Sequence, residues 1–337
     1  MLVGVGFTPI ETRSEVVMRV AKRADEVGLD FIGVAEGWTY DATILLAEVA
    51  LQTSRIKIGS RVVSVLGRTP ATIALAAAGL QRCSGGRFWL GLGAGSPPLA
   101  EGFHGVVWGR PVTRLRETAT CVRELLSGER LPNPINGARP LRLGSSVDVP
   151  IPIALAALSA SSIRLTGEVA DEWVPFLWAR SRIDEARALL HVGESSTEAP
   201  SPTRVCPAIP VALASDEETA RELAGWWLST YATRMGPLYP QMLSERFGVG
   251  AQLNAVVEAS DGGRRPSLPT TADDLAAEVT LMGTYDEVGD KIAAWSQAGA
   301  DAVNLTLPPG RPEPELLEIV DAAARHVVHT PDAAVTH

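Results

Sequence analysis

The sequence predicts an α/β fold, a (β/α)8 TIM barrel with a helical insertion after its seventh strand. Eight short apolar runs alternate with helix-like segments along the 337 residues, as in a sheet of parallel strands joined by helices. The first run leads into Thr8-Pro9-Ile10-Glu11-Thr12, so the GxGxxG loop that opens a doubly wound dinucleotide-binding fold is absent. We therefore expect one barrel domain over residues 1–330, with residues 236–281 inserted into it.

The first half of the chain carries the clearest strand and helix signals. Residues 88–92 form an apolar run that ends in the glycine-rich Gly91-Leu92-Gly93-Ala94-Gly95, as expected for a loop at the carboxyl end of a barrel strand. Gly28 is typical of a helix C-cap and Asp41 of a helix N-cap. The expected strands are 3–8, 31–35, 56–63 and 87–92, and the expected helices are 14–28, 41–53 and 70–83.

The second half repeats this alternation with longer interruptions. Pro111 and Gly128 bound a helix, and residues 128–150, rich in Pro, Gly and Asn, are expected to form an excursion. A loose tail is expected after His329. The expected strands are 152–156, 172–176, 204–213 and 301–306, and the expected helices are 111–127, 159–169, 181–190, 215–234, 284–298 and 313–328.

Composition narrows the classes of function. The net charge of −9 argues against a nucleic acid partner and against anionic membranes. No run of about 18 apolar residues suggests a membrane span, and the N-terminal MLVGVGFTP is typical of a strand rather than a signal peptide. Cys83, Cys121 and Cys206 are far apart, with no CxxC motif and no histidine cluster, so we expect a cytoplasmic protein without a metal site.

Several motifs resemble one family in the order in which that family carries them. They are IKIGSRVVSV followed by GRTP, SGGRFWLGLGAG, AKRADEVGLDFIGVAEGWTYD, EGFHGVVWGRPVTRLRET, SSIRLTGEVADEWVP and GTYDEVGDKIAAWSQAGADAVNL. These segments resemble the bacterial-luciferase-like superfamily, and within it the branch that uses the deazaflavin coenzyme F420, such as methylenetetrahydromethanopterin reductase. The resemblance implies an oxidoreductase with coenzyme F420 as cofactor.

The resemblance also implies a role for Glu36, which follows the second strand. Relatives carry an acidic residue here that faces the deazaflavin, and the dehydrogenase-type relatives follow it with a histidine that serves as a base toward an alcohol. This chain has Gly37 there, which makes alcohol oxidation by that mechanism unlikely and favours reduction of an activated C=C or C=N bond. The alternative interpretation of Glu36 is a rim carboxylate paired with Arg61 or Arg68.

Other cofactor contacts follow from the same resemblance. Deazaflavin-dependent relatives have a non-proline cis peptide at the end of strand three, which here is Arg61–Val62, and the bulge supports the ring. The cofactor phosphate rests at a helix N-terminus, a place that favours anions. The remaining expected cofactor contacts are Gly93, Gly95 and Ser96 after strand four, Ser159 and Ala160 at the helix terminus, and Arg180 and Arg182 as charge contacts, with a plain helix cap as the alternative.

Barrel geometry places the substrate pocket at the carboxyl ends of the strands. Phe7, Trp38 and Trp178 fall there and are expected to wall the pocket, while Asn304-Leu305-Thr306 ends the last strand.

Three hypotheses remain open for function. They are an F420-dependent reductase, an FMN-dependent monooxygenase supplied by a separate reductase, and a barrel that binds a ligand without catalysis. Relatives often pair through the helices near strands two and three, so a homodimer acting on a small molecule is expected.

Overall fold

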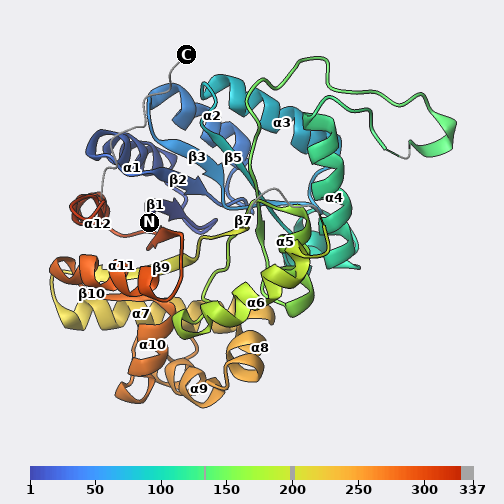
Figure 1. The fold of residues 1–337 in the computed structure, drawn as a ribbon. Helices are drawn as coiled ribbons and strands as arrows, with labels where there is room; N and C mark the ends of the chain where they lie inside the picture. Colours follow the sequence, from blue (N-terminus) through green and yellow to red (C-terminus); the bar gives the residue numbers. More distant parts are fainter. Residues whose placement is uncertain (133, 198–201, 328–337) are drawn as a thin grey trace.

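The computed structural model describes residues 1–132, 134–197 and 202–327, so the tail expected after His329 lies outside the described residues. The fold is a (β/α)8 TIM barrel whose parallel strands are surrounded by helices (Figure 1). The strands are β1 (Leu2–Phe7), β2 (Phe31–Val34), β3 (Lys57–Ser60), β4 (Val63–Ser64), β5 (Phe88–Gly93), β6 (Ile153–Ala156), β7 (Glu172–Trp173), β8 (Arg204–Val205), β9 (Ala208–Ala214), β10 (Leu281–Thr284) and β11 (Ala302–Leu307).

The sheet closes through a strand that is interrupted once. From β1 the neighbours run through β2, β3, β5, β6 and β7 to β8 in one direction, and through β11 to β9 in the other. β8 and β9 are two parts of one predicted strand, separated at Pro207, which lacks the N–H that a ladder requires. Because β7 pairs with β8 and β9 pairs with β11, this single stretch of chain joins the two edges of the sheet.

Helices cover the outside of the barrel. They are α1 (Ser14–Val27), α2 (Ala42–Gln52), α3 (Pro70–Cys83), α4 (Pro111–Leu126), α5 (Ala160–Val169), α6 (Ile183–Glu194), α7 (Glu217–Thr233), α8 (Leu238–Gln241), α9 (Gly250–Ala259), α10 (Asp273–Val279), α11 (Val288–Gln297) and α12 (Glu313–Ala324). Gly28 ends α1 in the left-handed conformation, and the Asp41 side chain accepts a hydrogen bond from the N–H of Thr43 at the start of α2, as the sequence predicts. In the described part of the chain no helix is long and apolar enough to cross a membrane.

Besides the strand divided at Pro207, three strands differ from the prediction. The strand expected at 172–176 is regular only over two residues because Pro175 removes a ladder donor, although Phe176 still bridges to Ala208. The strand expected at 56–63 is divided into β3 and β4 by a bulge. β10, which pairs with β9, lies at the end of the segment expected to be a helical insertion and was not predicted.

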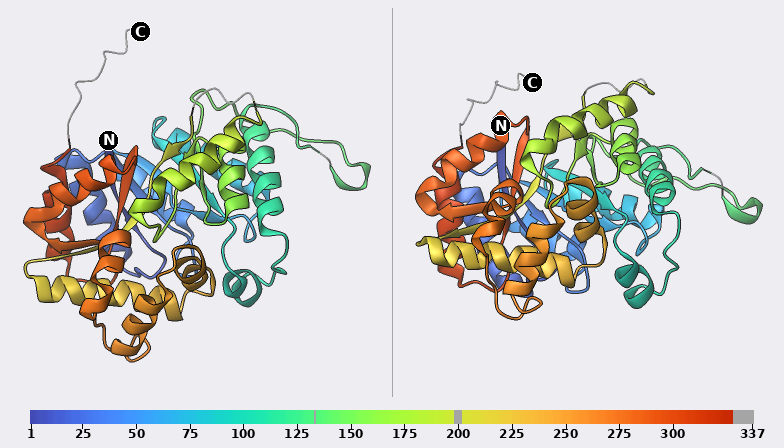
Figure 2. Two further views of the ribbon diagram at one scale, coloured as in Figure 1. Left: turned by 60° about the horizontal axis from the view of Figure 1, so that its bottom comes forward. Right: turned by 90° about the horizontal axis from the view of Figure 1, so that it is seen from below.

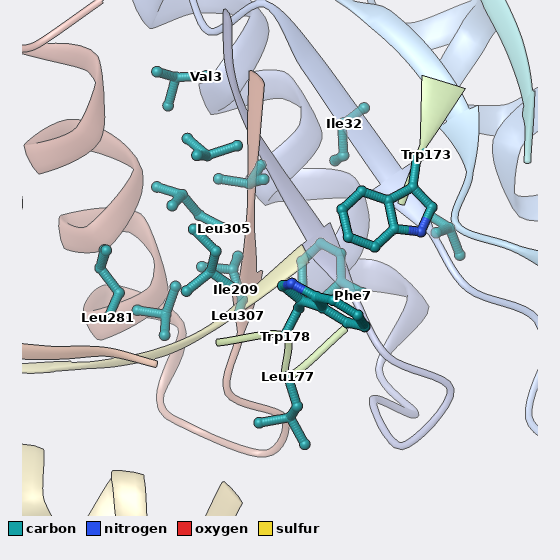
Figure 3. Packing of buried hydrophobic residues seen from close by; sticks show 14 of the residues in the cluster. Val3, Phe7, Ile32, Trp173, Leu177, Trp178, Ile209, Leu281, Leu305 and Leu307 are labelled. Atoms are coloured by element: carbon teal, nitrogen blue, oxygen red, sulfur yellow. The ribbon is translucent and has the colours of Figure 1, made fainter. Parts of the chain in front are cut away.

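Apolar side chains fill the barrel and the layer between sheet and helices. Figure 3 shows Phe7, Trp173 and Trp178 close together, with Leu305 and Leu307 of β11 beside Phe7 and Trp178. Between α5 and α6 the backbones touch at two glycines. A Cβ on Gly167 would collide with the carbonyl oxygen of Leu190, and one on Gly193 would collide with that of Arg164. The two helices are therefore as close as their backbones allow.

Two segments extend from the barrel. The chain between α4 and β6 forms the expected excursion and projects away from the body, while the chain around α8 and α9 packs below α7 (Figures 1 and 2). This second segment closes one side of the cavity described below.

Candidate functional site

A cavity of about 460 Å³ lies at the carboxyl ends of the barrel strands. This is the end at which TIM barrels hold their active sites. Nine of the residues expected at the site line the cavity together: Phe7, Glu36, Trp38, Arg61, Val62, Gly93, Gly95, Ser96 and Ser159.

Glu36 is held by an arginine, as one of the two interpretations from the sequence stated. Its carboxylate forms an ion pair with Arg68, whose second contact is Asp41 at 2.8 Å, and its side chain is 6% exposed. The hydrogen bond to Glu36 raises the pKa of Arg68. The N–H of Glu36 donates to the carbonyl of Val62 at 3.1 Å, which ties the main chain of Glu36 to the bulge.

Gly37 leaves no room for a larger residue. A Cβ at this position would collide with the side chain of Pro9. The histidine that dehydrogenase-type relatives carry at this position therefore does not fit here unless the loop that holds Pro9 moves.

The Arg61–Val62 peptide is cis, as the resemblance implied. Val62 faces the cavity, and a Cβ on Gly93 would come within 2.5 Å of its side chain. The Arg61 side chain points into the barrel, where it forms an ion pair with Glu172 and lies 5.1 Å from the Phe31 ring centre. Both charged side chains are almost fully buried, at 2% and 3% exposed.

The N-terminus of α5 opens beside the cavity. Ser159 lines it and forms a capping box with Ser162, accepting from the Ser162 N–H at 3.2 Å. Ala160 begins the helix but does not line the cavity. The N–H groups and the dipole of this terminus make it a place where an anion is stabilised.

The arginines predicted as charge contacts for this terminus, Arg180 and Arg182, are paired with carboxylates elsewhere. Arg180 pairs with Glu278 at 3.4 Å and Arg182 with Glu185 at 3.6 Å, and neither lines the cavity, because both side chains lie beyond the turn that follows β7. Arg246, from the chain between α8 and α9, lies beside this terminus, although it too is not among the residues that line the cavity. Its Nη1 donates to the carbonyl of Leu158 at 3.1 Å, and its Nη2 pairs with Glu185 at 2.6 Å.

Trp178 is also placed differently from the prediction. Leu177 adopts a left-handed conformation with φ of 55°, so the chain turns after Phe176 and does not continue as a strand. The Trp178 ring is 1% exposed, lies edge-on to Trp173 at 5.1 Å and donates to the carbonyl of Arg182 (Figure 3). It belongs to the core and not to the pocket.

An aromatic wall that the sequence did not predict closes the other side of the cavity. We define it as Phe176, Tyr231 of α7 and Tyr239 of α8, with ring centres of Phe176 and Tyr231 4.7 Å apart and those of the two tyrosines 5.0 Å apart. Burial raises the pKa of Tyr239 to about 12 and raises that of Tyr231 well above its usual value. Both phenols are therefore neutral near pH 7.

Two polar side chains at the end of β11 point to a ligand. Asn304 and Thr306 line the cavity and are only 2% and 3% exposed. Within the described residues, the Asn304 Oδ1 and Thr306 Oγ1 atoms have no hydrogen-bond partner. Since buried polar atoms are normally paired, these two await a partner from a bound molecule or water.

Residues 7–302 match the model of the luciferase-like monooxygenases. The chain belongs to this family. The family expected from the sequence motifs is thus confirmed. Among curated relatives of this luciferase-like chain is a Mycobacterium tuberculosis protein named "putative coenzyme F420-dependent oxidoreductase", 26% identical over 89% of this chain and 92% of that protein.

Solved structures of similar fold include a coenzyme F420-dependent enzyme and a monooxygenase in complex with FMN. The coenzyme F420-dependent tetrahydromethanopterin reductase of Methanopyrus kandleri aligns with a TM-score of 0.76 at 19% identity, over 97% of this chain and 98% of that one. The oxygenating constituent of 3,6-diketocamphane monooxygenase of Pseudomonas putida, in complex with FMN, aligns with a TM-score of 0.66 at 20% identity, over 97% and 99%.

The residues of this luciferase-like barrel fit a flat cofactor that carries a phosphate. The volume lies within the range of ligand pockets, about 300–1,000 Å³. Because Gly93 has no side chain, Val62 has room to line the cavity, and the N-terminus of α5 offers an anion site beside it. The described residues contain no group of three or more His, Cys, Asp or Glu side chains that could hold a metal ion.

Proposed function

We propose that this chain is a coenzyme F420-dependent oxidoreductase that reduces an activated C=C or C=N bond of a small organic molecule. The observation that carries the proposal is that the cavity contains proton donors but no free base. In the part of the chain that the structure describes, no histidine lines the cavity.

Each titratable group at the cavity favours reduction. Glu36 is already engaged in an ion pair with Arg68. Tyr231 and Tyr239 are phenols that burial keeps neutral by raising the pKa of both, so each presents an O–H donor and neither serves as a base. Oxidation of an alcohol requires a base, whereas reduction of an unsaturated bond requires a donor.

The proposed cofactor contacts divide among three parts of the site. Val62, Gly93, Gly95 and Ser96 would support the ring, with Glu36 beside it, and Arg61 would act from behind the bulge. Ser159 and Ala160 would hold the phosphate, with Arg246 in place of Arg180 and Arg182. When bound, coenzyme F420 supplies a hydride from C5 of its deazaflavin ring.

FMN-dependent oxygenation is the second candidate, supported by the similar fold of the FMN-containing monooxygenase. In that case a separate reductase would supply reduced flavin. A third candidate is a barrel that binds a ligand without catalysis.

We also propose a homodimer formed through α2 and α3. Ile44 and Leu51 lie seven residues apart on α2, and so on one face of the helix, and are 71% and 74% exposed. Leu75 on α3 is 61% exposed. A group of exposed aliphatic side chains on neighbouring helices is typical of an interaction surface.

We also propose a cytoplasmic location. Cys83, Cys121 and Cys206 are free thiols, which supports this proposal.

The experiment that tests the function is titration of the purified protein with oxidised coenzyme F420 and, separately, with FMN. Tryptophan fluorescence reports binding, because Trp38 and Trp108 line the cavity. Preferential quenching by F420 is the expected result. Tighter binding of FMN, together with oxygen consumption, would favour the monooxygenase, and binding of neither would favour the non-catalytic barrel.

A further inference from the structure

The substrate class of this site follows from how its polar and apolar groups are divided. Among the described residues that line the cavity, two carry a charged side chain, Glu36 and Arg61. Each already has a partner of opposite charge: Glu36 pairs with Arg68, which also contacts Asp41, and Arg61 pairs with Glu172, which also contacts Arg204. A charged substrate would therefore lose its hydration and meet only charges that already have partners.

The aromatic wall offers a surface for a planar molecule. Its rings meet at tilted and edge-on angles, with interplanar angles of 43° between Phe176 and Tyr231 and 84° between Tyr231 and Tyr239. Met235, between α7 and α8, and Leu238, the first residue of α8, extend the same apolar side. Aromatic faces and edges of this kind favour stacking with a flat conjugated ligand.

The two unpaired side chains at the end of β11 add a polar point to this apolar side. The position of Asn304 is fixed by its surroundings, since a Cβ on Gly6 would lie 2.6 Å from its Oδ1. An amide oxygen accepts and does not donate, so its missing partner is an N–H or O–H group. The hydroxyl of Thr306, two residues on and on the same side of the strand, can accept or donate.

We infer that the substrate is an uncharged, planar, conjugated molecule that lies against Phe176, Tyr231 and Tyr239 and donates a hydrogen bond to Asn304 Oδ1. This inference rests on the proposed function for its hydride donor. It assigns Asn304 and Thr306 as the residues that select the substrate, and they are distinct from those proposed to hold the cofactor. A ligand without the donor leaves the Asn304 oxygen buried and unpaired.

Three probes test the two features separately. 2-Quinolone is neutral and planar and carries one N–H donor. N-methyl-2-quinolone lacks the donor, and 2-quinolone-4-carboxylate adds a charge. Binding of each is measured by calorimetry with wild-type protein, with and without coenzyme F420.

We expect 2-quinolone to bind about tenfold more tightly than its N-methyl analogue, as for a lost hydrogen bond to a buried acceptor, and the carboxylate to bind weakest. In Asn304→Leu this tenfold preference should fall to about twofold or less. Thr306→Val, which keeps the side-chain shape, serves as a second variant if Asn304→Leu is unstable. Asn254→Leu, at an exposed position of α9, is the matched control and should keep the wild-type preference.

The outcomes separate this inference from the proposed function. Equal binding of 2-quinolone and its N-methyl analogue, unchanged preference in Asn304→Leu, or tightest binding of the carboxylate would overturn the substrate class even if F420 binds. Loss of F420 affinity in Asn304→Leu would also overturn it, because the orphaned oxygen would then serve the cofactor. If wild-type protein binds no F420 but shows the predicted order of probes, the proposed function fails and the subsite stands.

Discussion

Removing the charge of Glu172 should destabilise the barrel strongly. Glu172 lies at the start of β7 and is the partner of Arg61, and the two side chains are 3% and 2% exposed. Arg61 Nε and Nη2 have no hydrogen-bond partner among the described residues, so Glu172 is the main compensation for this buried cation. Glu172→Gln keeps the shape but leaves the guanidinium without its counter-charge, which costs about 3–5 kcal/mol.

The expected change in melting temperature follows from the length of the chain. With an unfolding entropy of about 2.1 cal/mol/K per residue, 337 residues give about 0.7 kcal/mol/K, so Tm should fall by about 4–7 °C. Scanning calorimetry measures this change. Glu318→Gln is the control, because Glu318 and Arg325 are 4.0 Å apart and about half exposed, and its Tm should move by about 1 °C or less.

A double variant completes the test. In Arg61→Met with Glu172→Met, no buried charge is left without a partner, and most of the lost stability should return. The reasoning would be refuted by a Glu172→Gln protein that melts within about 1 °C of wild type, or by a double variant that melts no higher than Glu172→Gln.

Three further predictions concern the phosphate site, the aromatic wall and the dimer surface. Arg246→Met should weaken binding of coenzyme F420 about tenfold, as for a lost charge-assisted hydrogen bond. It should leave binding of the deazaflavin without its phosphate tail unchanged. Equal weakening of both ligands, or an equal effect of Arg182→Met, would contradict the role of Arg246. Since burial raises the pKa of Tyr239 from 10 to about 12, the folded state holds this proton more tightly, and the free energy of unfolding should fall as pH rises from 10 to about 12. Urea denaturation should show a smaller fall in Tyr239→Phe, and an identical fall would exclude this source. Leu51→Glu should convert a dimer into monomers in sedimentation, while an unchanged mass would place any dimer contact elsewhere.

Much of the fold could be predicted because its signals are local. Alternating apolar runs mark the strands, and Gly28, Asp41 and Ser159 mark helix ends through contacts within a few residues. The strand-end rule then placed Glu36 and Ser96, among others, at one cavity, since carboxyl ends of parallel strands share one end of a barrel.

The remaining site depends on contacts between distant parts of the chain. Tyr231 and Tyr239 lie on α7 and α8, and Arg246 lies between α8 and α9, so no strand end marks them. How that segment folds back over the barrel is a matter of tertiary packing that periodicity does not encode. The prediction that Trp178 lines the pocket was wrong for a local reason. Leu177 is left-handed, so the Trp178 side chain does not point the way that alternation along a strand would give.

The contact between α5 and α6 links the anion site to a helix that never reaches the cavity. Gly167 and Gly193 face opposite carbonyl groups, so a side chain on either would push the helices apart and tilt the N-terminus at Ser159. A substitution at either glycine is therefore tolerated only if the facing helix changes with it. Neither can gain even a methyl group alone. A lineage that moved α5, and with it the proposed phosphate site, would have to rebuild the facing turn of α6 in the same step.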